Sequence, residues 1–227
     1  MKKNYLLFSA LLVLALMVFA SASFAQGSGP SDATTPAPTN ATDVGKVLCA
    51  GSTISISGPQ DPNGVDWTTY QWYKLDASGN KQLTSTTGRI YTEVATGAGY
   101  YTYQVVTVNA SGCTSPISDP FKVYVLPPLT ATITNAVSTI CAGVGSTVLT
   151  ANPTPSTGYT LNYQWTRNGV PIAGATGNTY TVSNETTPGT VAFGVTVSYT
   201  LNSSCTGSAS TDVIIAPIPT KPSITAN

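Results

Sequence analysis

Short segments in which apolar and polar residues alternate recur along the chain after residue 45. β-Branched and aromatic side chains dominate these segments, which is typical of strands with one buried face. The segments are 53–57, 101–108 and 122–125 in the first half, and 147–150, 191–200 and 213–215 in the second. Asn-Gly, Pro-Asn-Gly and Ser-Gly steps between segments are turn signals. No helical periodicity is found beyond residue 25, so we predict an all-β fold.

Three sequence markers occur twice in nearly the same register. The pairs are Cys49-Ala50-Gly51 with Cys141-Ala142-Gly143, Tyr70-Gln71-Trp72 with Tyr163-Gln164-Trp165, and Cys113 with Cys205, separated by 92, 93 and 92 residues. Such a repeat indicates two copies of one domain. We therefore predict two tandem β-sandwich domains, over residues 44–127 and 128–217. The repeated Trp72 and Trp165 are the predicted centres of the two cores.

The N-terminus has the pattern of a secretion signal. Two lysines precede an apolar run over residues 5–20, and Ser23-Phe24-Ala25 follows as a small-x-small cleavage site. The apolar run is shorter than the roughly 20 residues that cross a bilayer. We predict a signal peptide over residues 1–25, a mature chain that starts at Gln26, and a secreted or cell-surface location.

The two ends of the mature chain are predicted to be extended. Residues 26–43 are rich in Pro, Thr and Ser and contain no large apolar side chain, which is typical of a flexible linker. Residues 216–227 resemble the passage 126–135 between the repeats. The tail 218–227 is therefore either the start of a further repeat or a free strand that pairs with another copy.

Composition removes several function classes. The chain has 227 residues, of which 8% are charged, with nine basic, nine acidic and no histidine residues. The missing histidine excludes Ser-His-Asp and Cys-His catalysis. The few basic residues give no footprint for nucleic acid. A spatial pair such as Asp66 with Glu93 stays open, but no carboxylate spacing is specific to a glycosidase. We expect neither enzymatic activity nor a cofactor.

Two clusters are weak candidates for binding. Asp61, Asn63 and Asp66 place three oxygen side chains within six residues and would suit Ca²⁺, although the Pro-Asn-Gly step favours a plain turn. Trp67 has no counterpart in the second repeat. Together with Tyr70 and Tyr73 it is a possible ligand face for a sugar or a protein, and partial burial beside the core is the alternative.

The spacing of the cysteines and tryptophans resembles an immunoglobulin-like sandwich. In each repeat a Trp follows the first Cys by 23 or 24 residues, and a second Cys follows the first by 64. The amino-acid sequence is also similar to the Ig-like and PKD-like repeats of large secreted surface proteins of gliding-type Gram-negative bacteria. The matching stretches are 112–114, 140–143, 163–165, 168–176 and 179–182. The resemblance implies fold and compartment, and adhesive, spacer or ligand-binding roles.

All four cysteines are expected to form disulfides in a secreted chain. The repeated separation favours Cys49–Cys113 and Cys141–Cys205 among the three possible connectivities. Cys113 follows a Ser-Gly turn, so the bond should join a loop or strand end instead of pinning the two sheets. In a standard immunoglobulin domain these turns lie at opposite poles, so pairing between repeats remains the alternative.

The sequence thus predicts a secreted, non-enzymatic stalk or adhesion module of a bacterial cell surface. Its partner would be an extracellular protein or a glycan. One alternative is a carbohydrate-binding module that uses Trp67 and Tyr70. Another is an extracellular fibre subunit that assembles as a homo-oligomer through its C-terminal strand.

Overall fold

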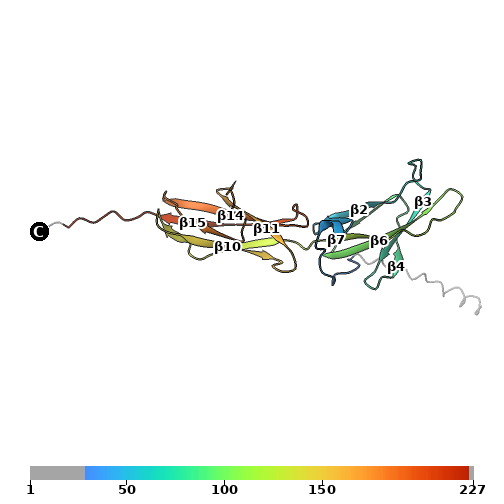
Figure 1. Cartoon of the computed structure of the whole chain (residues 1–227), viewed down its shortest axis with the longest axis horizontal. Helices are drawn as coiled ribbons and strands as arrows, with labels where there is room; N and C mark the ends of the chain where they lie inside the picture. Colours follow the sequence, from blue (N-terminus) through green and yellow to red (C-terminus); the bar gives the residue numbers. More distant parts are fainter. Residues whose placement is uncertain (1–28, 225–227) are drawn as a thin grey trace, which may run out of the picture.

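The computed structural model describes residues 29–224, which form two β-sandwiches placed end to end (Figure 1). The predicted signal peptide, residues 1–25, lies outside the described residues. Within residues 29–224, no helix combines the length and apolar character needed to cross a membrane.

The first domain follows a short 3₁₀ helix η1 (Ala41–Asp43) and contains seven strands. They are β1 (Lys46–Leu48), β2 (Thr53–Ser57), β3 (Thr69–Leu75), β4 (Lys81–Leu83), β5 (Ile90–Val94), β6 (Gly99–Val108) and β7 (Phe121–Val125). One sheet has the order β1-β7-β6-β3-β4, and the facing sheet consists of β2 and β5. Strand β1 runs parallel to β7, and the other pairs are antiparallel.

The second domain repeats this plan with one more strand. Its strands are β8 (Thr130–Asn135), β9 (Thr139–Cys141), β10 (Thr147–Thr154), β11 (Leu161–Arg167), β12 (Val170–Pro171), β13 (Thr179–Val182), β14 (Gly189–Tyr199) and β15 (Thr206–Ala216). The sheets have the orders β12-β11-β14-β15-β9 and β13-β10-β8. These orders are those of an immunoglobulin-like sandwich, as the sequence predicts.

The cores lie between the facing sheets and follow the alternation of the strands. In β3 the residues Tyr70, Trp72 and Lys74 point inward, and the residues between them are less buried. Trp72 and Trp165 are buried in the two cores. Each indole N–H donates at 2.9 Å to the carbonyl of a glycine just before a strand of the facing sheet. Trp72 binds Gly88 before β5, and Trp165 binds Gly177 before β13. The polar edge of each tryptophan is thus satisfied inside an apolar core.

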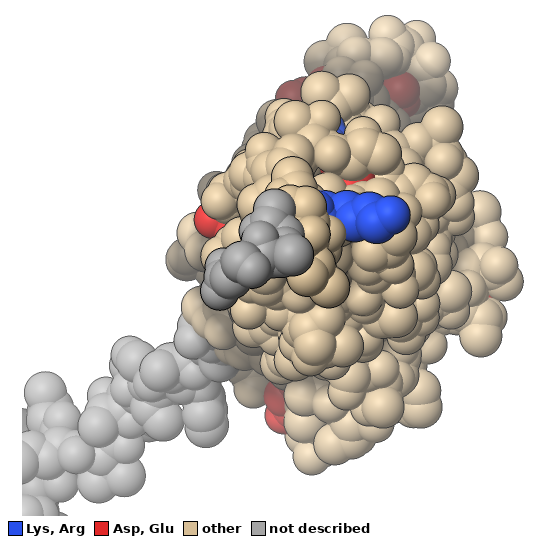
Figure 2. Space-filling view, turned by 90° about the vertical axis from the view of Figure 1, so that its left-hand side faces the viewer, with Lys and Arg blue, Asp and Glu red and all other residues tan. Residues whose placement is uncertain are grey.

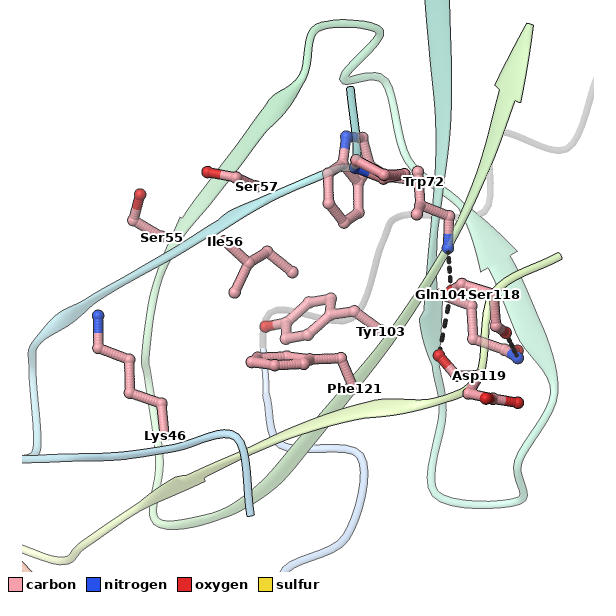
Figure 3. A pocket seen from close by; sticks show the side chains of 12 residues that line it. Lys46, Ser55, Ile56, Ser57, Trp72, Tyr103, Gln104, Ser118, Asp119 and Phe121 are labelled. Carbon is pink, nitrogen blue, oxygen red and sulfur yellow. Dashed lines mark hydrogen bonds between the residues drawn. The ribbon is translucent and has the colours of Figure 1, made fainter. Parts of the chain in front are cut away.

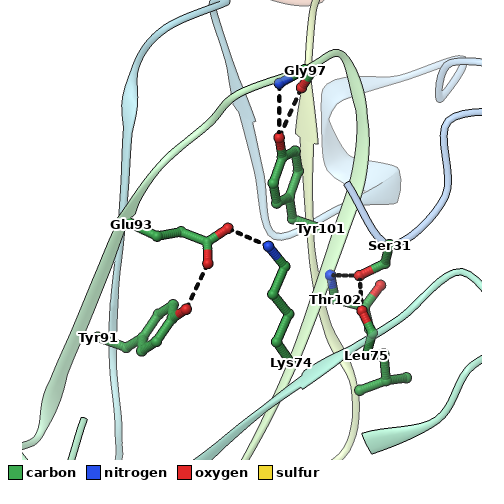
Figure 4. Close-up of polar contacts among 8 residues, drawn as sticks. All are labelled: Ser31, Lys74, Leu75, Tyr91, Glu93, Gly97, Tyr101 and Thr102. Carbon is green, nitrogen blue, oxygen red and sulfur yellow. Dashed lines mark hydrogen bonds and ion pairs between the residues drawn. The ribbon is translucent and has the colours of Figure 1, made fainter. Parts of the chain in front are cut away.

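The N-terminal segment does not behave as the predicted linker. Ser31 is buried, and its hydroxyl donates to the carbonyl of Leu75 and accepts from the N–H of Thr102 (Figure 4). The backbones of Asp32 and Tyr100 exchange two hydrogen bonds of 3.1 and 2.7 Å. Residues 31 and 32 therefore bind to the first domain, and Ala37 packs against the core cluster of the second. The small Ser31 hydroxyl and the Asp32 backbone make these bonds, so a composition without large apolar residues does not prevent them.

Candidate functional site

A disulfide crosses from one domain to the other. Cys49 directly follows β1, and Cys205 directly precedes β15; their Cα atoms are 5.4 Å apart and their sulfurs are bonded. Cys113 and Cys141 are exposed free thiols. The predicted pairs Cys49–Cys113 and Cys141–Cys205 are therefore wrong, and the pairing runs between repeats. As expected, the bond joins strand ends and not the facing sheets of one sandwich.

The direction of the strands explains why the two cysteines of one repeat cannot form a disulfide with each other. Leu48 pairs with Val125, so Cys49 lies at the end of β7, whereas Cys113 precedes the start of β7. In the second domain, Cys141 pairs with Ala216 and Cys205 precedes Thr206, so the eleven-residue β15 separates them. A strand of this length spans about 33 Å, and a disulfide requires Cα atoms within about 7 Å. The 64-residue separation recurs because the fold recurs.

Polar contacts reinforce the junction around the disulfide. The Asn202 side-chain amide donates to the carbonyl of Val47 at 2.9 Å, across 155 residues of sequence. The Tyr199 hydroxyl donates to the carbonyl of Pro127 at 3.2 Å. The hydroxyls of Tyr124 and Tyr159 lie 3.1 Å apart and share a hydrogen bond. The two domains are thus connected at several points besides the covalent bond.

Apolar packing is continuous across the same junction. Tyr124 and Leu126 belong to the first domain and its exit, yet they pack in the core cluster of the second domain, against which Val44 and Val47 also pack. Burial raises the pKa of Tyr199, which lies at this joint, to about 12. Domains joined by a small, polar interface usually move relative to each other. A buried apolar joint restricts such hinge motion.

The fold buries one of the three residues of the predicted ligand face and leaves the other two partly exposed. Tyr70 is buried in the first core, where its hydroxyl donates to the Pro59 carbonyl and accepts from the Trp67 N–H, so including it among ligand contacts was wrong. The physical reason is the two-residue period of β3, which gives Tyr70 the inward direction of Trp72. Trp67 is half-buried beside that core, and Tyr73 is partly exposed on the opposite face of β3.

The oxygen-rich cluster forms a turn. Asp61 accepts hydrogen bonds from the backbone N–H groups of Asn63 and Val65, and these bonds lower the pKa of its carboxyl. Asp66 instead pairs with Arg89 at 3.0 Å and accepts from Gln60. Within residues 29–224, no three His, Cys, Asp or Glu side chains gather into a set suited to a metal ion.

A buried ion pair that the sequence reasoning missed bridges the two sheets of the first domain. The Lys74 ammonium of β3 lies 2.7 Å from a carboxylate oxygen of Glu93 on β5, with 5% and 15% of their side chains exposed. Tyr91 donates to the other oxygen at 2.6 Å, and Lys74 lies 4.8 Å from the centre of the Tyr101 ring (Figure 4). Glu93 and Asp66 are thus held by different cations, Lys74 and Arg89, which does not support a carboxylate pair.

A cavity of about 480 Å³ opens at one edge of the first sandwich, between β2 and β7. Ile56, Trp72, Tyr103 and Phe121 present apolar atoms to it, and Lys46, Ser55 and Asp119 lie at its margin (Figure 3). The side-chain amide of Gln104 donates to the Ser118 carbonyl at 2.7 Å and closes one end. An apolar opening beside a strand edge suits an extended peptide better than a charged small molecule.

Comparisons with known proteins find only distant similarity to solved structures. No family model and no curated protein matches the chain. It is similar to solved structures of fibronectin(III)-like modules of Clostridium thermocellum CbhA, with 12% identity, 85% of this chain and 99% of that chain covered and a TM-score of 0.41. It is also similar to the FN1–FN3 domains of chicken CNTN1, with 14% identity, 80% of this chain and 65% of that chain covered, and a TM-score of 0.40. The N-terminal four Ig domains of Dscam1 isoform 8.4 are 16% identical, with 75% of this chain and 42% of that chain covered and a TM-score of 0.36.

Proposed function

We propose that the chain is a secreted, non-enzymatic stalk or adhesion module of a bacterial cell surface. The disulfide between Cys49 and Cys205 carries this proposal, because it locks two sandwiches into one elongated unit. Disulfides persist mainly in oxidising, extracellular compartments, so the bond agrees with a secreted protein. The low charge and the signal-like N-terminus agree with this compartment.

The mechanism of such a stalk is the transmission of force and position through its junction. The disulfide closes a loop of 156 residues that includes most of both domains. Separation of the domains would require rupture of a covalent bond in addition to exposure of the apolar joint. The hydrogen bonds of Asn202 and Tyr199 fix the rotation of one domain against the other.

The test measures whether the two ends keep a fixed distance. Cys113 and Cys141 are exposed thiols near the two ends and accept a pair of spin labels without further changes to the chain. Electron–electron double resonance should give one narrow distance distribution for the labelled chain. The Cys49→Ser/Cys205→Ser variant should give a broader distribution, because only the apolar joint and the hydrogen bonds around it then hold the domains. A broad distance distribution in the labelled chain that keeps the Cys49–Cys205 bond would refute the rigid stalk.

A further inference from the structure

The first domain lacks a strand that the second domain has. In the second domain β10 pairs with β13 on one edge and with β8 on the other. In the first domain β2 pairs only with β5. Within residues 29–224, no strand occupies the other edge of β2. Unpaired strand edges in native proteins are usually covered or used for binding.

The strands β2 and β10 are counterparts in detail. The Gly58 N–H donates to the Arg89 carbonyl at 2.8 Å, and the Ala151 N–H donates to the Asn178 carbonyl at 2.9 Å. Ile56 pairs with Tyr91 as Leu149 pairs with Tyr180. The free edge of β2 therefore corresponds to the edge of β10 that β8 occupies.

The cavity of the first domain lies where β8 lies in the second. Ser55, Ile56 and Ser57 of β2 line one side, and Phe121 of β7 lines the other (Figure 3). In the second domain, the inward-facing Ala131 of β8 and its neighbour Ile133 pack against the core at this position. The first domain thus has an apolar opening shaped by a missing strand.

The N-terminal segment of the same chain is engaged elsewhere. Asp32 bridges to Tyr100 on β6, and the Tyr100 hydroxyl donates to the Pro36 carbonyl. Lys46 then begins β1, which pairs with β7. Residues 29–48 therefore follow β6 and β7 and leave the free edge of β2 open.

The C-terminal segment resembles the strand that the first domain lacks. Lys221–Asn227 aligns with Thr130–Ala136, which places Ile224 at the position of Ile133. Ile224 is completely exposed, and residues 217–224 extend away from the second domain without a strand partner (Figure 1). The end of the molecule that they leave carries few charged side chains on the face seen in Figure 2.

The proline in this segment is compatible with the proposed pairing. Pro222 aligns with Ala131, which lies opposite Pro153 in the ladder between β8 and β10. The backbone of Ala151 donates toward β13, and Pro153 lies two residues further, so Ala131 is in a non-hydrogen-bonded pair. A proline there removes no ladder hydrogen bond. Lys221 would lie opposite Asp61, where the second domain has two neutral threonines.

The free cysteines independently indicate the same arrangement. Cys141 is the repeat counterpart of Cys49, and Cys113 is that of Cys205. Cys49 and Cys205 are bonded across the domain junction, whereas their counterparts are exposed thiols. Cys141 lies beside Ala216, from which the C-terminal segment leaves. If the next domain were the first domain of another copy, its Cys113 would occupy the place that Cys205 takes within the chain.

We propose that the chain assembles head to tail by repeating its own domain junction between copies. The segment from Lys221 to Ile224 of one copy adds an antiparallel strand to the free edge of β2 in the next copy. Ile224 enters the cavity beside Ile56 and Phe121, and Cys141 of the first copy forms a disulfide with Cys113 of the second. This goes beyond the stalk function, since a chain that remains monomeric would still serve as a rigid stalk.

The covalent step needs a disulfide oxidant, such as oxidised glutathione or a thiol–disulfide oxidoreductase. The Cys141 thiolate attacks one sulfur of the oxidant, a mixed disulfide forms, and one thiolate leaves. The Cys113 thiolate of the next copy then attacks the mixed disulfide and displaces the second thiolate. Two electrons pass to the oxidant, and the two protons lost by the cysteines end on the thiols that it releases.

The test combines two single-cysteine variants of the chain from Gln26 to Asn227. The Cys113→Ser protein keeps Cys141 and serves as strand donor, and the Cys141→Ser protein keeps Cys113 and serves as acceptor. In a glutathione redox buffer, the mixture should form covalent heterodimers that each protein alone does not form. Mass spectrometry should identify the Cys141–Cys113 peptide pair. Homodimers of either protein at the rate of the mixture would overturn the proposal.

The strand exchange has a matched control in the same mixture. Ile224→Asp in the Cys113→Ser donor should slow heterodimer formation about tenfold or more, because a charged side chain cannot replace isoleucine in the cavity. The same Ile224→Asp change in the Cys141→Ser acceptor should have no effect, since its tail is not used. Equal rates for both placements, or no effect of either, would overturn the strand addition.

Discussion

The buried pair of Lys74 and Glu93 allows a quantitative test of the first domain. The change Glu93→Gln keeps the size of the side chain and removes the negative charge 2.7 Å from the Lys74 ammonium. Breaking a buried pair by changing one partner typically costs about 3–5 kcal/mol, because the remaining charge stays desolvated. Lys74 is 5% exposed, and Tyr91 also loses a charged acceptor. We expect a loss near the lower limit, about 3 kcal/mol, since glutamine still accepts hydrogen bonds.

The assay is urea unfolding followed by pulse-labelling hydrogen exchange, which reports each domain through its own peptides. A loss of about 3 kcal/mol corresponds to a fall in Tm of roughly 12 °C or more for a domain of this size. The control is Glu185→Gln in the second domain, whose partner Arg167 is 43% exposed, and it should cost less than about 1 kcal/mol.

A double replacement separates the ion pair from simple packing. Lys74→Met/Glu93→Leu should recover most of the lost stability, because well-packed apolar residues can replace a buried pair. If Glu93→Gln stays within about 0.5 kcal/mol of the parent chain, the pair is solvated in solution and this reasoning is refuted.

Four further outcomes are expected. Cys49→Ser should destabilise the chain by up to about 5 kcal/mol in urea unfolding, the loop-closure value for a separation of 156 residues, and an unchanged midpoint would contradict the cross-domain bond. The pKa of Tyr199 is about 12 when folded and about 10 when unfolded, so the native state keeps its proton longer and stability should fall from pH 10 to 12 by up to about 3 kcal/mol. Denaturation of Tyr199→Phe across that range should show a smaller slope. Trp67→Ala should leave glycan-array signals unchanged, and their loss would favour a carbohydrate-binding module. Export from a Gram-negative host should yield a mature N-terminus at Gln26, which Edman sequencing would check.

The repeat and the strand pattern were sufficient to predict two tandem sandwiches. The alternation around Trp72 and Trp165 is a local property, and each strand displays it without reference to the rest of the chain. The same period places Tyr70 and Lys74 on the inward face of β3. The burial of both was therefore available from the sequence, and assigning Tyr70 to a ligand face overlooked this.

The disulfide pairing could not be predicted from the sequence, for a geometric reason. Each repeat presents one cysteine at either end of the sandwich, so equal spacing is compatible with pairing within a repeat or with the next one. Only the direction of β1 along β7 shows that Cys49 faces the second domain. The free edge of β2 was hidden in the same way, because the Ser31 hydroxyl and the Asp32 backbone bond to β6, and no apolar pattern in the sequence predicts these contacts.

The connectivity of the cysteines tests the account most directly. The chain should be digested without reduction, with free thiols blocked beforehand, and the linked peptides identified by mass spectrometry. The account predicts a bond between the peptides of Cys49 and Cys205, with Cys113 and Cys141 blocked as thiols in the monomer. Bonds of Cys49 with Cys113 and of Cys141 with Cys205 would contradict it, because no disulfide would then cross the junction of the two sandwiches.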